Sequence, residues 1–193
     1  MLLQLILMLL SSLPPSQGSA VNTDKAPKPY ADAEAYEVYS AILPTERPWQ
    51  GANAKSLIIR SETKGYKMCL RPDEDSEKII GQAISQYVKL NEKNWLLKRG
   101  LSIKNPYELV PYNKLMSVLK SGSGENFYKR YPNSSGWIQL SAVGFNADKT
   151  VAVVYMGQHC GGLCGGGGFH VLQKKDGKWA LLKWKGASCA WEA

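Results

Sequence analysis

The residue types best suited to chemistry gather in one stretch of the chain, Gly157–His170. It contains both histidines, two of the four cysteines and seven glycines. Imidazole and thiolate are ligands that Zn²⁺ and copper accept, so one hypothesis is a metal site made by His159, Cys160, Cys164 and His170. Because neighbouring residues of a strand point to opposite faces, His159 and Cys160 would share an ion only on irregular backbone. Metal-binding or thiol/disulfide activity of this loop is therefore kept as the alternative interpretation.

The cysteines favour disulfides over metal ligation. Cys160 and Cys164 are separated by Gly-Gly-Leu, and in an oxidising compartment such a pair can close a small loop. The spacing differs from the two-residue spacing of thioredoxin-like redox motifs. A second bridge between Cys69 and Cys189 would use the remaining thiols, but four cysteines allow three pairings and the sequence does not choose among them.

Other kinds of catalytic site find little support in the sequence. The glycine run Gly165–Gly168 leads into a strand pattern and is not followed by Gly-Lys-Ser/Thr, so it is not a phosphate-binding loop. A Gly-x-Ser-x-Gly nucleophile motif does not occur. We therefore assign no catalytic residue and expect no cofactor, and the chain is predicted not to be an enzyme.

Strand patterns flank the glycine stretch and must position it. Strong strand patterns are separated by turn-forming residues at Asn146–Lys149 and Lys175–Gly177, and they cover Trp137–Phe145, Thr150–Met156, Phe169–Lys174 and Lys178–Lys185. Apolar residues occupy both faces of the second of these strands, which predicts a central strand covered on both sides. Four consecutive strands with short connections predict an antiparallel meander, and the glycine stretch is expected to be the loop between its second and third strands.

The N-terminal half is richer in helical patterns. Apolar residues at helical spacing predict helices over 31–42 and 76–90, and shorter helices after Pro111 and over 125–131. Further strands are expected at Leu57–Glu62, Tyr66–Leu70 and Leu101–Lys104. Together these patterns predict an α+β fold, in which an antiparallel meander of about four to six strands has the N-terminal helices packed on one face.

Composition and the N-terminus point to export. Residues 1–20 have the apolar run and the small residues of a signal peptide, with cleavage expected near Ala20. Residues 21–30 are expected to be a flexible lead-in, and residues 31–193 a single α+β domain. No later segment approaches the roughly 18 apolar residues of a transmembrane helix, so the chain is not expected to span a membrane. The predicted location is periplasmic or secreted.

The charge of the chain gives little information about its partners. The net charge is +8, but the lysines are scattered along the 193 residues. A solvated, mildly basic surface explains this distribution, so specific binding to nucleic acid is not expected. The partner stays open, with an envelope component or a small ligand as candidates.

Several short motifs occur in an order that resembles a known group of proteins. They are Tyr131-Pro132, Ser141-x-Val143-Gly144-Phe145-Asn146, Cys160-Gly161-x-Leu163-Cys164-Gly165 and Lys175-x-Gly177-x-Trp179. This succession resembles a group of exported bacterial proteins of uncharacterised function, and the resemblance implies export and a single domain but no activity. The final Lys-x-Gly-x-Trp hairpin is also similar to those of cystatin-like and nuclear-transport-factor-like α+β domains. The sequence thus predicts an exported, non-catalytic binding or envelope-accessory module.

Overall fold

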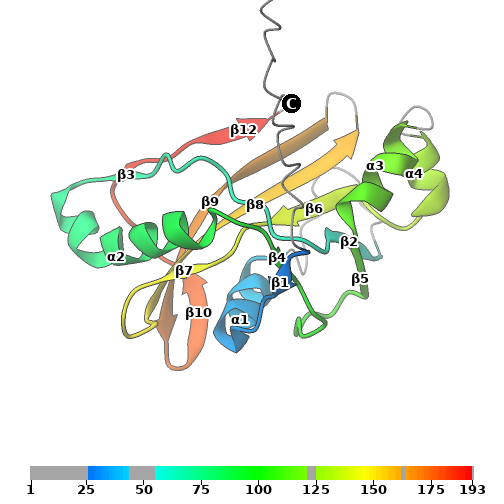
Figure 1. Cartoon of the computed structure of the whole chain (residues 1–193). Coiled ribbons are helices and arrows are strands. Elements are labelled where there is room, and N and C mark those ends of the chain that lie inside the picture. Colours follow the sequence, from blue (N-terminus) through cyan, green and yellow to red (C-terminus); the bar gives the residue numbers. More distant parts are fainter. Residues whose placement is uncertain (1–25, 44–54, 121–124, 162–163, 193) are drawn as a thin grey trace, which may run out of the picture.

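The computed structural model describes residues 26–43, 55–120, 125–161 and 164–192. The predicted signal peptide and residues 21–25 of the predicted lead-in lie outside this range. Within it, the chain forms an α+β structure with four helices around a mixed sheet of eight strands (Figure 1).

The large sheet has the strand order β10-β9-β8-β6-β2-β5, and two short strands, β7 and β12, pair with β8 and β9. Its strands are β2 (Leu57–Arg60), β5 (Tyr107–Val110), β6 (Trp137–Leu140), β7 (Gly144–Phe145), β8 (Val151–Gly161), β9 (Cys164–Lys175), β10 (Lys178–Leu181) and β12 (Ala190–Glu192). Two small ladders lie outside it. They pair β1 (Lys28–Pro29) with β4 (Trp95–Leu96), and β3 (Arg71–Pro72) with β11 (Gly186–Ala187).

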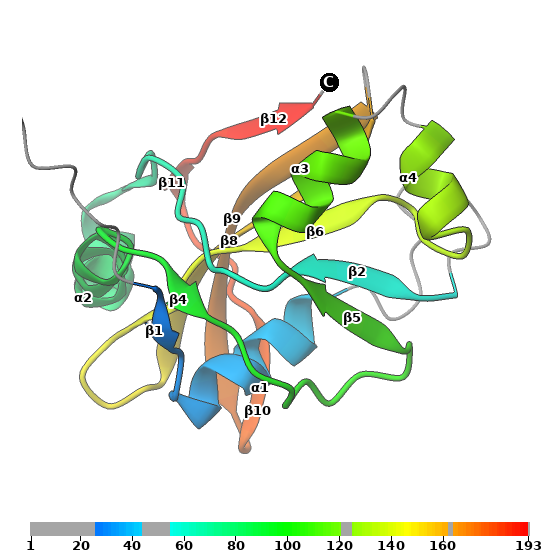
Figure 2. The same ribbon diagram turned by 45° about the vertical axis from the view of Figure 1, so that its right-hand side comes forward.

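The prediction of a purely antiparallel meander of four to six strands is wrong. The antiparallel part from β6 to β10 is present, but β2 pairs in parallel with both β5 and β6. Parallel strands need long crossover connections, and helices supply them here. The connection between β5 and β6 contains α3 (Tyr112–Lys120) and α4 (Glu125–Arg130), which lie together beside this part of the sheet (Figure 2).

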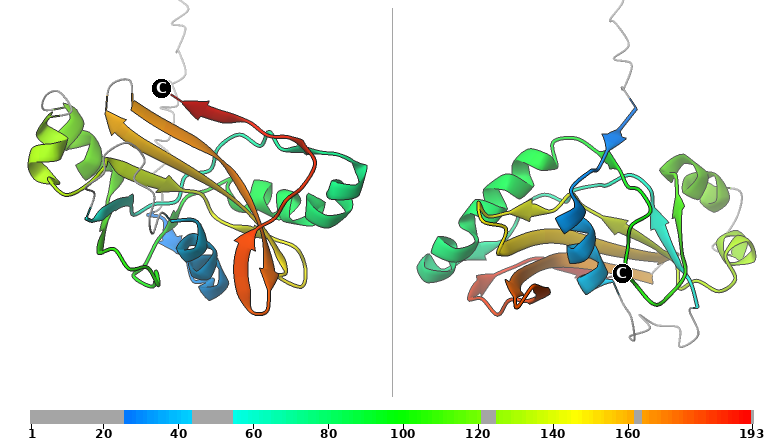
Figure 3. Two further views of the ribbon diagram at one scale, coloured as in Figure 1. Left: turned by 180° about the vertical axis from the view of Figure 1, so that it is seen from behind. Right: turned by 90° about the horizontal axis from the view of Figure 1, so that it is seen from below.

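The helices cover both faces of the sheet, not one as predicted. On β8, Ala152 and Val154 pack in the same cluster as residues of α1 (Ala33–Ile42), whereas Val151 and Val153 pack with residues of α2 (Glu74–Leu90). Because alternate residues of a strand face opposite ways, α1 and α2 lie on opposite sides of the sheet (Figure 3). The central strand is thus covered on both sides, as its apolar pattern predicted.

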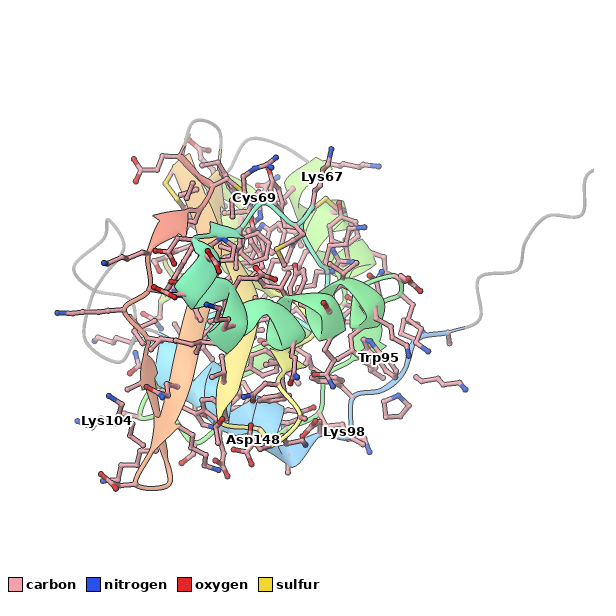
Figure 4. All side chains as sticks on the ribbon, turned by 90° about the vertical axis from the view of Figure 1, so that its left-hand side faces the viewer. Lys67, Cys69, Trp95, Lys98, Lys104 and Asp148 are labelled. Atoms are coloured by element: carbon pink, nitrogen blue, oxygen red, sulfur yellow. A yellow bond between two sulfur atoms is a disulfide. The ribbon has the colours of Figure 1, made fainter. Side chains whose placement is uncertain are left out.

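Helix ends follow local signals. Asp32 caps α1 by accepting a hydrogen bond from the Glu34 amide at 3.1 Å, and Asp73 caps α2 through the Ser76 amide at 2.8 Å. At the other end of α2, Trp95 Nε1 donates to the Leu90 carbonyl at 2.9 Å, which holds the chain against the last turn (Figure 4).

Part of the expected flexible lead-in belongs to the folded domain. Lys28 and Pro29 form β1, and Tyr30 is only 4% exposed. The Tyr30 hydroxyl accepts a hydrogen bond from the Val143 amide at 2.9 Å and donates to the Val143 carbonyl. A buried aromatic ring, packed beside Tyr36, Tyr39 and Trp95, therefore anchors the start of the described chain.

Three strand predictions are corrected. Residues 66–70 and 101–104 form no strand, and the predicted strand Trp137–Phe145 is divided into β6 and β7. The short helices predicted after Pro111 and over 125–131 are present as α3 and α4. The largest correction concerns the glycine stretch, which is mostly strand.

Candidate functional site

The Gly157–His170 stretch is the far end of the long β8–β9 hairpin. His159 pairs with Gly165 and Gly161 pairs with Cys164, with an irregularity in the ladder between His159 and Gly161. The pair Cys160–Cys164 forms a disulfide with 5.1 Å between the Cα atoms, which closes the hairpin end. The predicted loop is therefore an extended ladder, in which strand pairing compensates for the weak strand preference of glycine.

The structure does not bring the four hypothetical metal ligands together. His159 lies on the face that carries Trp137, its partner across the β6–β8 ladder, whereas His170 pairs with Val154 on the α1 face. The sulfurs of Cys160 and Cys164 are bonded to each other. Among the described residues, no group of three His, Cys, Asp or Glu side chains has metal-binding geometry.

His159 instead lies between two tryptophans. Its ring stacks on Trp137 with 4.2 Å between centroids and an interplanar angle of 17°, and Trp191 lies 5.3 Å away at 37°. Burial lowers the pKa of His159, so the imidazole is neutral at pH 7. In this setting His159 acts as a third flat ring and not as a charged group.

The glycines make room for Trp191. A Cβ on Gly165 would lie 3.2 Å from two ring carbons of Trp191, and a Cβ on Gly167 would lie 2.7 Å from its Nε1 atom. The Trp191 indole therefore rests directly on the backbone of β9. Strand β12 fixes this position, since Trp191 pairs with Gly167 in its ladder with β9.

Tyr155 extends this group of rings along the sheet. Trp191 Nε1 donates a hydrogen bond to the Tyr155 hydroxyl at 2.6 Å, and Tyr66 stacks on Tyr155 with 4.8 Å between centroids and 10° between planes. Tyr66 is 44% exposed while Tyr155 is 2% exposed. One end of the group is thus open to solvent and its middle is fixed.

The other end is formed at the carboxyl ends of the parallel strands. Tyr112 packs edge-on against Trp137 at 6.4 Å and is 40% exposed. The Arg60 guanidinium lies 4.1 Å from the centre of the Tyr112 ring, and Arg60 is paired with Glu62 at 3.4 Å. Glu62 Oε2 also accepts the Tyr112 amide at 3.0 Å. We call the whole set the aromatic row; its members are Tyr66, Tyr155, Trp191, His159, Trp137 and Tyr112.

The second disulfide supports the row from outside the sheet. Cys69 and Cys189 are bonded, with 5.9 Å between their Cα atoms. Cys69 lies in the segment between Tyr66 and β3, and Cys189 immediately precedes β12, which carries Trp191 (Figure 4). The bond therefore ties together the two segments that place Tyr66 and Trp191 over the sheet. Both disulfides match pairings that the sequence left open.

The row offers flat rings and few polar groups. Among the described residues, neither His159 nor His170 has a hydrogen-bonded hydroxyl or carboxylate partner of the kind that nucleophilic catalysis uses. Aromatic side chains together with a few fixed polar groups are typical of the residues that contact ligands in binding sites. The sequence pattern singled out His159 but not the other five rings, because these come from five separate segments of the chain.

No family model, curated protein or solved structure matches the chain. Within the described ranges, no helix is long and apolar enough to cross a membrane.

Proposed function

We propose that this chain is an exported, non-catalytic binding module, and that the aromatic row is its binding face. The observation that carries the proposal is the exposure of the two ends of the row. Tyr66 and Tyr112 are 44% and 40% exposed, although the rings that they contact are almost fully buried: Tyr66 stacks on Tyr155, and Tyr112 packs edge-on against Trp137. Large apolar rings held rigidly at the surface are a common feature of binding sites.

The two disulfides support a location outside the reducing cytosol. Bonds such as Cys69–Cys189 and Cys160–Cys164 persist in oxidising compartments, which suits a periplasmic or secreted protein released by cleavage near Ala20. The resemblance of the C-terminal motifs to exported bacterial proteins points in the same direction.

The chemistry of the row favours a sugar chain as ligand. The C–H face of a sugar ring packs on an aromatic ring, and its hydroxyls bond to neighbouring polar groups. Here the Arg60–Glu62 pair lies beside Tyr112, and the Gln139 amide lies on the same sheet face, donating to the Lys64 carbonyl at 3.3 Å. We therefore propose an oligosaccharide of the envelope as the ligand class.

Binding to an array of neutral and amino-sugar oligosaccharides tests the proposal. Tyr66→Ala and Tyr112→Ala should each weaken binding by about tenfold, equivalent to about 1.4 kcal/mol. Leu181→Ala is the control, because Leu181 is 68% exposed on β10, outside the row. Absence of binding to every glycan, or equal loss in the control, would contradict the proposal.

A free-thiol count with elemental metal analysis separates the proposal from its alternative. Protein purified without chelator should contain no free thiol and no metal. Two or more thiols with near one equivalent of zinc or copper would favour a metal-binding protein that uses His159, Cys160, Cys164 or His170. The separation of the two imidazoles on opposite sheet faces argues against that outcome.

A further inference from the structure

A cleft of about 300 Å³ lies away from the aromatic row, where the amino-terminal ends of β2 and β5 meet the end of α4. Its polar lining consists of Ser56, Tyr107, Glu108, Arg130, Tyr131 and Asn133. The volume is at the small end of the range for ligand pockets, which suits a metabolite of a few heavy atoms.

The charged residues of this cleft are not used by the fold. Among the described residues, the side chains of Glu108 on β5 and Arg130 on α4 take part in no ion pair and no hydrogen bond. Arg130 only lies over the ring of Tyr131, with 5.2 Å from the guanidinium carbon to the ring centroid. One carboxylate and one guanidinium thus line the same small cleft without neutralising each other.

Tyr131 adds a polar group without a partner. It is 4% exposed, and within the part of the chain that the structure describes its hydroxyl has no hydrogen-bond partner. A buried hydroxyl without a partner costs about 1–3 kcal/mol, so it calls for an explanation. Burial raises the pKa of Tyr131, the Glu108 carboxylate raises it further and Arg130 lowers it, so both charges act on this hydroxyl.

A larger cleft of about 430 Å³ beside α1 gives a useful contrast. There the Tyr36 hydroxyl donates to the Tyr30 carbonyl at 3.0 Å and accepts from the Lys98 amide at 2.8 Å. The Ser40 hydroxyl is likewise bonded, and Glu37 is paired with Lys174 at 3.6 Å. A ligand would have to displace these bonds, whereas the cleft at Tyr131 offers groups that are still unpaired.

We propose that the cleft at Tyr131 is a binding site for a small free α-amino acid. Arg130 binds the ligand carboxylate, for which the forked guanidinium is well suited. Glu108 pairs with the ligand ammonium, and the Tyr131 ring, over which the Arg130 guanidinium lies, forms part of the wall of the cleft. One carboxylate and one guanidinium in a small cleft match a zwitterion better than an anion or a cation, because a singly charged ligand would leave one of the two side chains unpaired.

Titration of the ¹⁵N-labelled protein with L-alanine, followed by NMR, tests the site. Amide signals of Glu108, Tyr131 and Asn133 should shift, with a Kd of about 1 mM or tighter. N-acetyl-L-alanine lacks the ammonium and L-alanine amide lacks the carboxylate, so each should bind at least about tenfold more weakly. No shift up to about 50 mM L-alanine, or equal binding of either blocked analogue, would overturn the proposal.

Matched variants connect the binding to the named side chains. Arg130→Gln and Glu108→Gln should each weaken L-alanine binding by about tenfold or more, whereas Lys129→Gln removes a neighbouring charge of α4 outside the cleft and should not. Tyr131→Phe keeps the ring that lines the cleft, so it should leave L-alanine binding within about twofold. It should fold at least as stably, because the lost hydroxyl is enclosed and has no partner in the free protein. Tyr128→Phe is the control for stability, because it removes a hydroxyl that does have a partner: the Tyr128 hydroxyl donates to the Cys160 carbonyl at 2.8 Å. Equal effects of Lys129→Gln and Arg130→Gln would refute the assignment.

Discussion

Two adjacent glycines of β9 provide a direct test of the aromatic row. A Cβ on Gly167 would lie 2.5 Å from the Tyr155 hydroxyl oxygen and 2.7 Å from Trp191 Nε1. A Cβ on Gly168 points to the other face, and its nearest neighbour would be the Cβ of Ala190 at 3.6 Å, an ordinary contact. The same substitution at neighbouring positions of one strand therefore has two different outcomes.

We expect Gly167→Ala to lower the free energy of unfolding by roughly 2–4 kcal/mol. Overpacking a well-packed site costs about 1–3 kcal/mol, and displacing Trp191 breaks its hydrogen bond to Tyr155, which contributes about 1 kcal/mol. Gly168→Ala should stay within about 1 kcal/mol of the wild type, because the added methyl meets no clash and restricts the unfolded chain.

Thermal unfolding followed by circular dichroism, with both disulfides intact, measures the difference. Gly167→Ala should lower Tm by about 5–15 °C, while Gly168→Ala should change it by about 4 °C or less. Near-ultraviolet circular dichroism reports the tryptophan environment and should change only for Gly167→Ala. If both variants unfold at the wild-type temperature, Trp191 does not rest on β9 and the description of the row is incorrect.

Three further predictions concern the disulfides and pH. In the chain-entropy treatment, removing the Cys69–Cys189 disulfide, with a sequence separation of 120, should lower the free energy of unfolding by about 5 kcal/mol. Removing the Cys160–Cys164 disulfide, with a separation of 4, should lower it by about 2 kcal/mol. Urea unfolding of the two double Cys→Ser variants measures both losses. A hydrogen bond from Lys174 lowers the pKa of Glu34. The stability due to Glu34 is therefore present above about pH 4.5 and is lost as the pH falls through the folded pKa. In Glu34→Gln, the free energy of unfolding should depend less steeply on pH in the acidic range. Burial lowers the pKa of His159 below 6.5, so the unfolded chain takes up a proton first and stability should fall as the pH falls through 6.5; the NMR titration midpoint of the His159 imidazole should lie below 6.5.

Features determined by a few neighbouring residues were predictable from the sequence. Helix α2 follows from its Asp73 cap and from the apolar stripe that contains Ile80, Ala83 and Tyr87. The last hairpin turns at Asp176 and Gly177, whose φ angles of 49° and 73° are those of a two-residue turn that favours Asp-Gly. In these segments the local preference and the tertiary structure agree.

The pairing of distant strands was not predictable in this way. The short strand Tyr107–Val110 has no clear alternation, whereas the neighbouring Leu101–Lys104 alternates apolar and polar residues. What makes the former a strand is its parallel pairing with Leu57–Arg60. Pairing partners are chosen by packing across the whole domain, so single-sequence patterns located the antiparallel hairpins and missed the parallel half of the sheet.

The glycine stretch failed as a loop prediction for a related reason. Four consecutive glycines, Gly165–Gly168, have poor strand preference by themselves. They become strand because they pair with β8 on one side and β12 on the other, and because Trp191 covers the space that their missing side chains leave. The residue that explains the glycines is thus near the end of the chain, in a position that no local pattern connects to them.

The residue types best suited to chemistry and the side chains that the fold leaves unpaired are different sets. Cys160 and Cys164 are bonded to each other, and His159 is packed between two indole rings. Glu108 and Arg130, which no motif singled out, keep unpaired charges beside the orphan hydroxyl of Tyr131. A residue type indicates which chemistry a side chain could perform in isolation. The contacts of that side chain in the folded protein determine whether it is still free to react or to bind a ligand. Unpaired groups that line a cleft are therefore the stronger guide to a ligand in this protein.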